Sequence, residues 1–96
     1  MKLLIYAFPC KSIQMAVVDG YDPYGDDNES CKELTRRSSP SIGDVAKFAR
    51  NAFDEFGDMD EIIIFGPYSY TVKFKEYFEE DYPNHKIRIV SPKRSN

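Results

Sequence analysis

The chain has 96 residues, which is enough for one domain with a modest core and too short for two. Hydrophobic residues make up 42% and charged residues 30%, a balance that is typical of a folded globular protein and argues against general disorder. The net charge of −3 argues against nucleic acid as a partner, because such proteins need a basic surface to neutralise phosphates. We expect a single domain over residues 1–91 and a flexible tail over residues 92–96.

Two cysteines and one histidine are too few and too scattered for a structural zinc site, and no cofactor is predicted. The apolar start is too short for a signal peptide, and no segment reaches the length of a membrane span. We therefore expect a cytoplasmic protein with reduced thiols and no membrane partner.

The first part of the chain predicts strands. Residues 2–8 (KLLIYAF) and 13–18 (IQMAVV) are apolar and are joined by a short turn, which makes them an antiparallel hairpin that ends at Asp19-Gly20. Residues 21–30 form a polar, turn-rich loop. Residues 31–37 (CKELTRR) predict a third, charged strand at an edge of the sheet.

An amphipathic helix follows. Ser41 and Asp44 resemble a capping box, and Gly57 ends the helix as a C-terminal glycine does. The apolar residues fall at helical spacing and form one stripe: Val45, Phe48, Ala49, Ala52, Phe53 and Phe56.

The strand over residues 61–65 contains an uninterrupted apolar run, which predicts that helix layers cover it on both faces. A turn at Gly66, a second helix from about residue 71 to 81 and a last strand over residues 86–90 complete the chain. The predicted fold is α/β, with a mixed sheet of four or five strands in the order strand, strand, optional strand, helix, strand, helix, strand.

This order resembles the ribonuclease H-like superfamily, which includes the actin-like ATPase folds. Residues 4–20 (LIYAFPCKSIQMAVVDG) look like the opening hairpin of the bacterial tRNA threonylcarbamoylation accessory subunits, and residues 66–71 (GPYSYT) are similar to their Gly-Pro-Gly-Ser-Phe-Thr turn. Two departures are chemical: Ala7 stands where the family has a carboxylate, and Tyr68 replaces the middle glycine. Because metal-dependent nucleases need several carboxylates, the resemblance implies the topology without nuclease or ATPase chemistry.

The turn over residues 66–71 is a candidate anion site because it precedes a helix N-terminus, where free N–H groups and the helix dipole attract negative charge. Its ligands would be Gly66, Ser69, Thr71 and Lys73. The alternative is that Ser69 or Thr71 only caps the helix.

Four tyrosines are predicted to lie in loops: Tyr21, Tyr24, Tyr68 and Tyr70. Exposed tyrosines are common in protein interfaces, so these rings could form one binding face. The acidic loop over residues 19–29 is expected to be solvated, with calcium binding as the alternative. Cys10 is expected to be structural, and His85 to be exposed in a turn.

The sequence therefore favours a small intracellular protein without catalysis of its own that binds another protein or itself, in the manner of phage or mobile-element accessory proteins. A homodimer is plausible because so short a chain exposes a sheet edge or an aromatic helix face. The alternative is a phosphate- or nucleotide-binding protein, or an enzyme, that uses the 66–71 turn.

Overall fold

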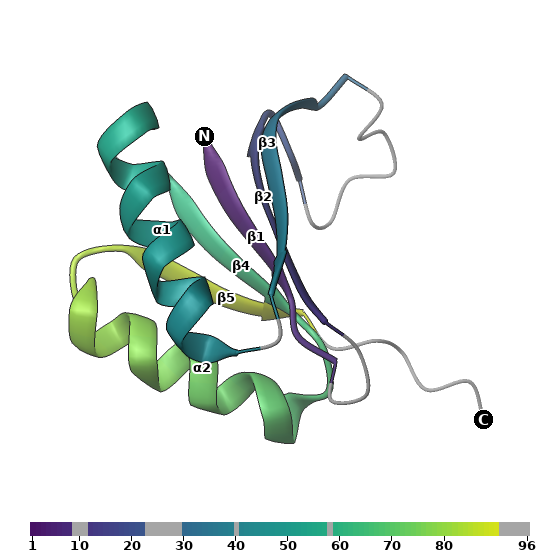
Figure 1. Cartoon of the computed structure of the whole chain (residues 1–96), viewed down its shortest axis with the longest axis vertical. Helices are drawn as coiled ribbons and strands as arrows, with labels where there is room; N and C mark the ends of the chain where they lie inside the picture. The colour runs from purple at the N-terminus through teal and green to yellow at the C-terminus, as the bar shows by residue number, and fades with distance from the viewer. Residues whose placement is uncertain (9–11, 23–29, 40, 58, 91–96) are drawn as a thin grey trace.

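The computed structural model describes residues 1–8, 12–22, 30–39, 41–57 and 59–90. The strands are β1 (Lys2–Tyr6), β2 (Ile13–Asp19), β3 (Lys32–Ser39), β4 (Glu61–Phe65) and β5 (Lys86–Val90), and the helices are α1 (Ile42–Phe56) and α2 (Tyr68–Asp81) (Figure 1). The predicted α/β fold is confirmed, and the described residues form one mixed sheet of five strands. Tyr24, Cys10, most of the acidic loop and the 92–96 tail lie outside the described residues.

The sheet has the strand order β3-β2-β1-β4-β5, with the first strand of the chain at its centre. In β1, Leu4 lies opposite Ala16 of the antiparallel β2 and beside Ile63 of the parallel β4. β3 pairs antiparallel with β2, and β5 pairs parallel with β4. β1 suits the central place because its middle residues are apolar and buried on both faces.

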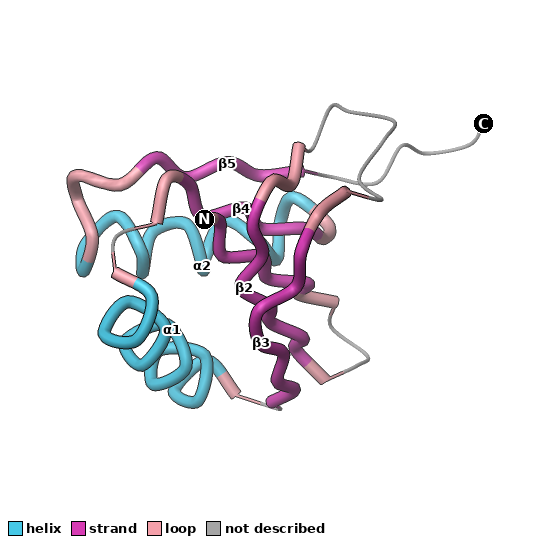
Figure 2. Tube along the Cα trace, turned by 90° about the horizontal axis from the view of Figure 1, so that it is seen from above, coloured by secondary structure: helices cyan, strands magenta, loops and turns pink. Residues whose placement is uncertain are grey.

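Both helices pack on the same face of the sheet (Figure 2). β3, β1, β4 and β5 all run in one direction, so the connections through α1 and α2 are both crossovers between parallel strands. Each steps toward the β5 edge, and right-handed crossovers that step the same way place their helices on the same face. The prediction that helix layers cover β4 on both faces is therefore wrong.

The main core lies between the sheet and the two helices. It contains buried residues from β1, β2, β4 and both helices: Leu3, Ile5, Met15, Val17, Val45, Phe48, Ala49, Ala52, Ile62, Ile64, Phe74 and Phe78. Ile63 points to the other face and is also fully buried, but it packs against Leu4, Ala16 and Val18. The uninterrupted apolar run of β4 is thus buried in two different ways. The helices cover one face of the strand, and neighbouring side chains of the sheet cover the other.

α1 begins and ends where the sequence predicts. The Ser41 hydroxyl accepts a hydrogen bond from the Asp44 backbone N–H at 3.4 Å, and Gly57 follows the last turn with a φ of 81°. Its N–H donates to the Phe53 carbonyl at 2.9 Å, which closes the helix. The capping residues therefore fix both ends of this helix.

Other boundaries differ from the prediction. α2 begins at Tyr68 instead of residue 71, because Pro67 has a fixed φ of −58° that suits a helix start and its carbonyl accepts from Thr71 N–H at 3.0 Å. β1 stops at Tyr6, two residues early, and β3 is shifted toward Ser39. β3 also contains a bulge where it passes Val17 and Val18.

Candidate functional site

The sheet face opposite the helices, called here the open face, has an apolar centre. Four residues of this face are at most 5% exposed: Leu4, Ala16, Val18 and Ile63. Five partly buried residues surround them: Tyr6, Tyr21, Cys31, Phe65 and Val90. Among the described residues these side chains, not a helix, cover the centre of the face.

A groove of about 320 Å³ lies on the part of the open face formed by β1, β2 and β3. Leu4, Ala16 and Val18 form its apolar floor. Tyr6, Tyr21 and Cys31 line its sides, and Glu33 and Arg36 stand at its rim. Its volume is near the lower end of the range for pockets that hold small molecules, and a few apolar side chains of a partner would also fill it.

Three aromatic rings pack together on the open face, and two of them, Tyr6 and Tyr21, line the groove. The Tyr6 and Phe65 rings stack with centroids 4.6 Å apart, and the Tyr21 ring meets Phe65 edge-on at 5.9 Å. Tyr21 follows β2 at the end of the sheet that is distant from Phe65, so the chain must turn back across the open face. Gly20 permits this turn, because its φ of 88° is unfavourable for other residues.

The environment of the groove makes its two phenols harder to ionise than an exposed tyrosine. Burial raises the pKa of Tyr6 above its ordinary value, and the nearby Arg36 guanidinium partly offsets this effect. Burial also raises the pKa of Tyr21, and the Tyr6 hydroxyl adds to the increase. Each phenol can therefore donate one hydrogen bond to a ligand near pH 7 while its ring contacts apolar groups.

The rim of the groove carries an exposed ion pair. Arg36 contacts the Glu33 Oε2 atom through Nε at 3.1 Å and through Nη2 at 2.5 Å. The two side chains are 65% and 43% exposed, so the pair contributes little to stability. It sets a charged, hydrogen-bonding margin beside an apolar floor, which is the usual arrangement of a protein interface.

A second charged group lies at the amino-terminal end of β1 and β4. Glu61 is 4% exposed, with Lys2 Nζ at 3.7 Å from Oε1 and Arg88 Nε at 2.6 Å from Oε2. Arg88 Nε and Glu61 Oε2 form an ion pair without hydrogen-bond geometry. The two cations compensate a carboxylate that would otherwise be buried without a partner.

Two of the four residues of the predicted anion site are buried and two are exposed. Gly66 is buried and its N–H donates to the Val90 carbonyl at 3.2 Å. Thr71 is fully buried, and its hydroxyl donates to the Tyr68 carbonyl at 3.2 Å. Ser69 and Lys73 are exposed. Pro67 is the N-cap of α2, and it makes no side-chain hydrogen bond to the first turn.

The predicted tyrosine face is only partly described. Tyr68 and Tyr70 lie in the first turn of α2, so their assignment to a loop is wrong. Tyr68 is 67% exposed, whereas Tyr21 lines the groove. His85, predicted to be exposed, is half-buried against the rings of Phe53 and Tyr82, at centroid distances of 4.8 and 5.7 Å.

Sequence reasoning missed Tyr6, Phe65 and Arg36 as site residues. The signal was the alternation within β1, where Leu3 and Ile5 face the helices while Leu4 and Tyr6 face the other way. A tyrosine at the end of such a strand indicates a face that is neither fully buried nor fully exposed.

In the described part of the chain, no group of three or more His, Cys, Asp or Glu residues could hold a metal ion. No helix in the same residues is long and apolar enough to cross a membrane. No family model matches the chain, and no curated protein shows a significant match to it.

Proposed function

We propose that this chain is a small accessory protein that binds a partner protein through the groove on its open face and has no catalysis of its own. One observation carries the proposal. An apolar floor with three aromatic rings lies on a sheet face that no described helix covers. Clustered apolar and aromatic side chains beside a charged rim favour a protein ligand over a highly charged one.

The groove favours a partner that inserts one or two large apolar side chains. Leu4, Ala16 and Val18 offer no hydrogen bonds from their side chains, so the inserted groups should be apolar. The hydroxyls of Tyr6 and Tyr21 and the Arg36–Glu33 pair can then bind backbone or polar atoms at the margin.

We also propose that the topology is ribonuclease H-like. An antiparallel set of three strands followed by two parallel strands, with the order β3-β2-β1-β4-β5, supports this assignment. Ala7 is fully buried just after β1, and the aromatic Phe65 ends β4. These uncharged residues at the carboxyl ends of the central strands support a binding role over metal-dependent hydrolysis.

The test is selection of peptides from a random display library on the immobilised chain. We expect the selected peptides to be rich in aromatic and aliphatic residues. Tyr21→Ala should weaken their binding about tenfold or more, because a central aromatic residue carries much of an interface's energy. Tyr68→Ala is the matched control, since Tyr68 is exposed and does not line the groove. Equal losses in both variants, or no selected peptide at all, would argue against the groove.

The second candidate function is anion binding at the start of α2. It is favoured by the absence of a side-chain cap there and by the exposed Lys73. Thermal-shift measurements with inorganic phosphate and with nucleotides test it. A rise in melting temperature that Lys73→Ala abolishes would favour this function, and no rise with any of them would leave the protein-binding proposal.

The partner in the first proposal could also be a second copy of the chain. Sedimentation velocity over a range of concentrations distinguishes the two forms. A dimer that Tyr21→Ala dissociates would identify the groove as a homodimer interface.

A further inference from the structure

The two edges of the sheet are protected to different degrees. β3 has a bulge and carries exposed charges of both signs, including Lys32 and Glu33, features that discourage another strand from pairing. β5 has neither a proline nor a register shift, and it pairs with β4 without interruption from Lys86 to Val90. Among the described residues, no strand pairs with the outer side of β5.

The outward backbone groups of β5 belong to Ile87 and Ile89. The Val90 carbonyl points to β4, because it accepts the Gly66 N–H at 3.2 Å. In a strand, the N–H and C=O of one residue point to the same side and successive residues alternate. Lys86, Arg88 and Val90 therefore face β4, and two N–H and C=O pairs remain on the outer edge. An added strand could bond to both pairs.

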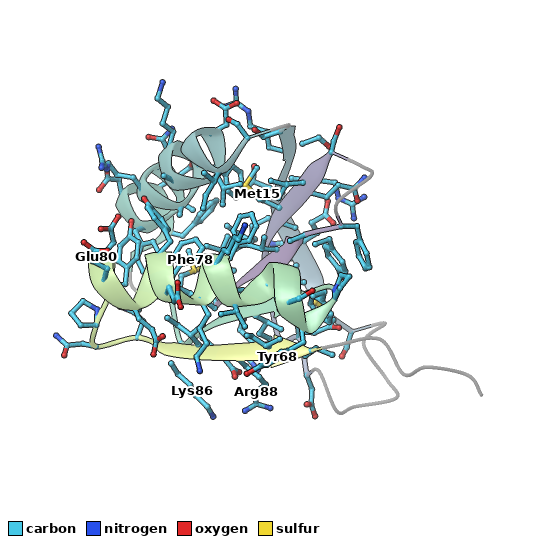
Figure 3. All side chains as sticks on the ribbon, turned by 90° about the horizontal axis from the view of Figure 1, so that it is seen from below. Met15, Tyr68, Phe78, Glu80, Lys86 and Arg88 are labelled. Carbon is cyan, nitrogen blue, oxygen red and sulfur yellow. The ribbon has the colours of Figure 1, made fainter. Side chains whose placement is uncertain are left out.

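Along most of β5, the side chains alternate between basic residues on one face of the sheet and apolar residues on the other. Lys86 and Arg88 project to the open face, away from α2 (Figure 3), whereas Ile87 packs against the main core. Lys86 is exposed and forms no ion pair with the described residues. Among the described residues, Lys2, Lys86 and Arg88 lie around one buried carboxylate, Glu61, so that positive charge exceeds negative charge in this part of the edge.

We propose that β5 is a docking edge for an extended acidic segment of a partner protein, which adds as an antiparallel strand. In that arrangement, partner residues opposite Ile87 and Ile89 form hydrogen-bonded pairs, and their apolar side chains cover the helix side. The residue between them lies opposite Arg88 at the closer, non-hydrogen-bonded position, where an acidic side chain fits. The partner segment therefore alternates acidic and apolar residues.

A second copy of this chain is disfavoured at this edge in the symmetric register centred on Arg88. Symmetric antiparallel pairing of two β5 strands centred on Arg88 would place the two Arg88 residues directly opposite each other, and like charges at that position are destabilising. The site is separate from the groove, which lies on β1, β2 and β3. The inference therefore does not depend on the proposed function of the groove.

The test uses a fluorescent seven-residue peptide in which glutamate alternates with valine. Control peptides replace glutamate with lysine, or carry N-methyl groups on the valines that would face the edge. Fluorescence anisotropy measures binding, and amide hydrogen exchange followed by NMR locates it. We expect binding of the glutamate peptide only, weaker at high salt, with slower exchange at Ile87 and Ile89.

Protein variants separate this edge from the other surfaces. Lys86→Glu should weaken binding about tenfold, whereas Lys32→Glu on the opposite edge and Tyr21→Ala in the groove should change it less than about twofold. Ile89→Pro removes one outward N–H and should abolish binding. The N-methylated peptide tests the same hydrogen bonds if this variant does not fold. Equal binding of the lysine peptide, unchanged exchange at Ile87 and Ile89, a loss with Lys32→Glu alone, or a dimer that Lys86→Glu dissociates would each overturn the proposal.

Discussion

The rings of Tyr6 and Phe65 stack on the open face with their planes 9° apart and their centroids 4.6 Å apart, joining the ends of the parallel strands β1 and β4. Tyr6 lines the groove, and its contact with Phe65 links two strands that are about 60 residues apart in the chain. It should therefore contribute to stability as well as to binding.

A double-mutant cycle on Tyr6→Leu and Phe65→Leu measures this contribution. We expect a coupling energy of about 0.5–1.5 kcal/mol in urea unfolding, the range for aromatic pairs beyond their area burial. The pair Tyr77 and Tyr6 is the control, since these residues lie on opposite faces of the sheet and should show additive effects. Additivity of the Tyr6 and Phe65 changes would mean that the rings are only neighbours.

Gly66→Ala should destabilise the protein by more than about 2 kcal/mol. A Cβ atom at this position would overlap the Ala7 carbonyl oxygen, at a φ of 152°. Gly57→Ala is the matched control, because Gly57 also has a positive φ but has open space around it, and it should cost about 1 kcal/mol. Thermal and urea unfolding measure both destabilisations, and equal values would show that Gly66 and the Ala7 carbonyl are not in close contact.

Glu61→Gln should destabilise the protein by about 2 kcal/mol, because it removes the negative charge that the partly buried Lys2 and Arg88 both contact. Their side chains are only 24% and 23% exposed. Glu33→Gln removes the partner of the exposed Arg36 and should cost less than about 1 kcal/mol. The free energies of unfolding of the two variants are compared at low and high salt. A larger and less salt-dependent loss in Glu61→Gln would show that burial makes the ion pairs of Glu61 stronger than that of Glu33.

Protonation of Asp44 should lower the stability of the protein in acid. Hydrogen bonds donated by the Ser39 hydroxyl at 2.8 Å and the Ser41 hydroxyl at 3.1 Å lower the pKa of this carboxyl below its usual 3.8. A group with a lowered folded-state pKa stabilises the protein above 3.8 and loses this contribution as the pH falls through the folded value. The melting temperatures of the wild type and of Asp44→Asn should therefore converge in acid and differ near neutral pH. Ser39→Ala should move the convergence to higher pH, and a constant difference at every pH would contradict this assignment.

The stabilising contribution of the neutral Tyr77 phenol should be lost in alkali. Burial and a hydrogen bond with Asp81 raise the pKa of its phenol from 10.0 to about 12. The contribution of a raised pKa is complete below pH 10 and is lost as the pH rises from 10 to about 12, because only the unfolded chain ionises in that interval. The difference in tyrosinate absorbance between the wild type and Tyr77→Phe should titrate near pH 12. Asp81→Asn should lower this value, and titration near 10 in the folded wild type would refute it.

Strongly patterned elements were predictable from the sequence. β4 and β5 match their predicted bounds because a glycine follows one and a proline-containing turn precedes the other. α1 matches because its capping residues and its apolar stripe indicate the same boundaries. α2 was predicted to start too late, since the tyrosines and serine after Pro67 read as a turn although proline itself favours a helix start.

The groove could not be predicted in the same way. Its position depends on both helices packing on one face, which follows from crossover handedness only once the strand order is known. It also depends on the turn at Gly20, which brings Tyr21 back across the sheet. There Tyr21 contacts Phe65, a residue from a distant part of the chain. Local sequence patterns carry no information about a contact between residues so far apart, so the sequence does not predict that these side chains form one groove.

The central position of β1 has a consequence for synthesis. β1 leaves the ribosome about 60 residues before β4, so its second edge stays unpaired until β4 has been made. At about 5–20 residues per second, this interval is roughly 3 to 12 s. During that time the nascent hairpin presents the apolar edge of Leu3, Leu4 and Ile5 to other chains, so translation speed between β3 and β4 should govern how much of the protein escapes aggregation.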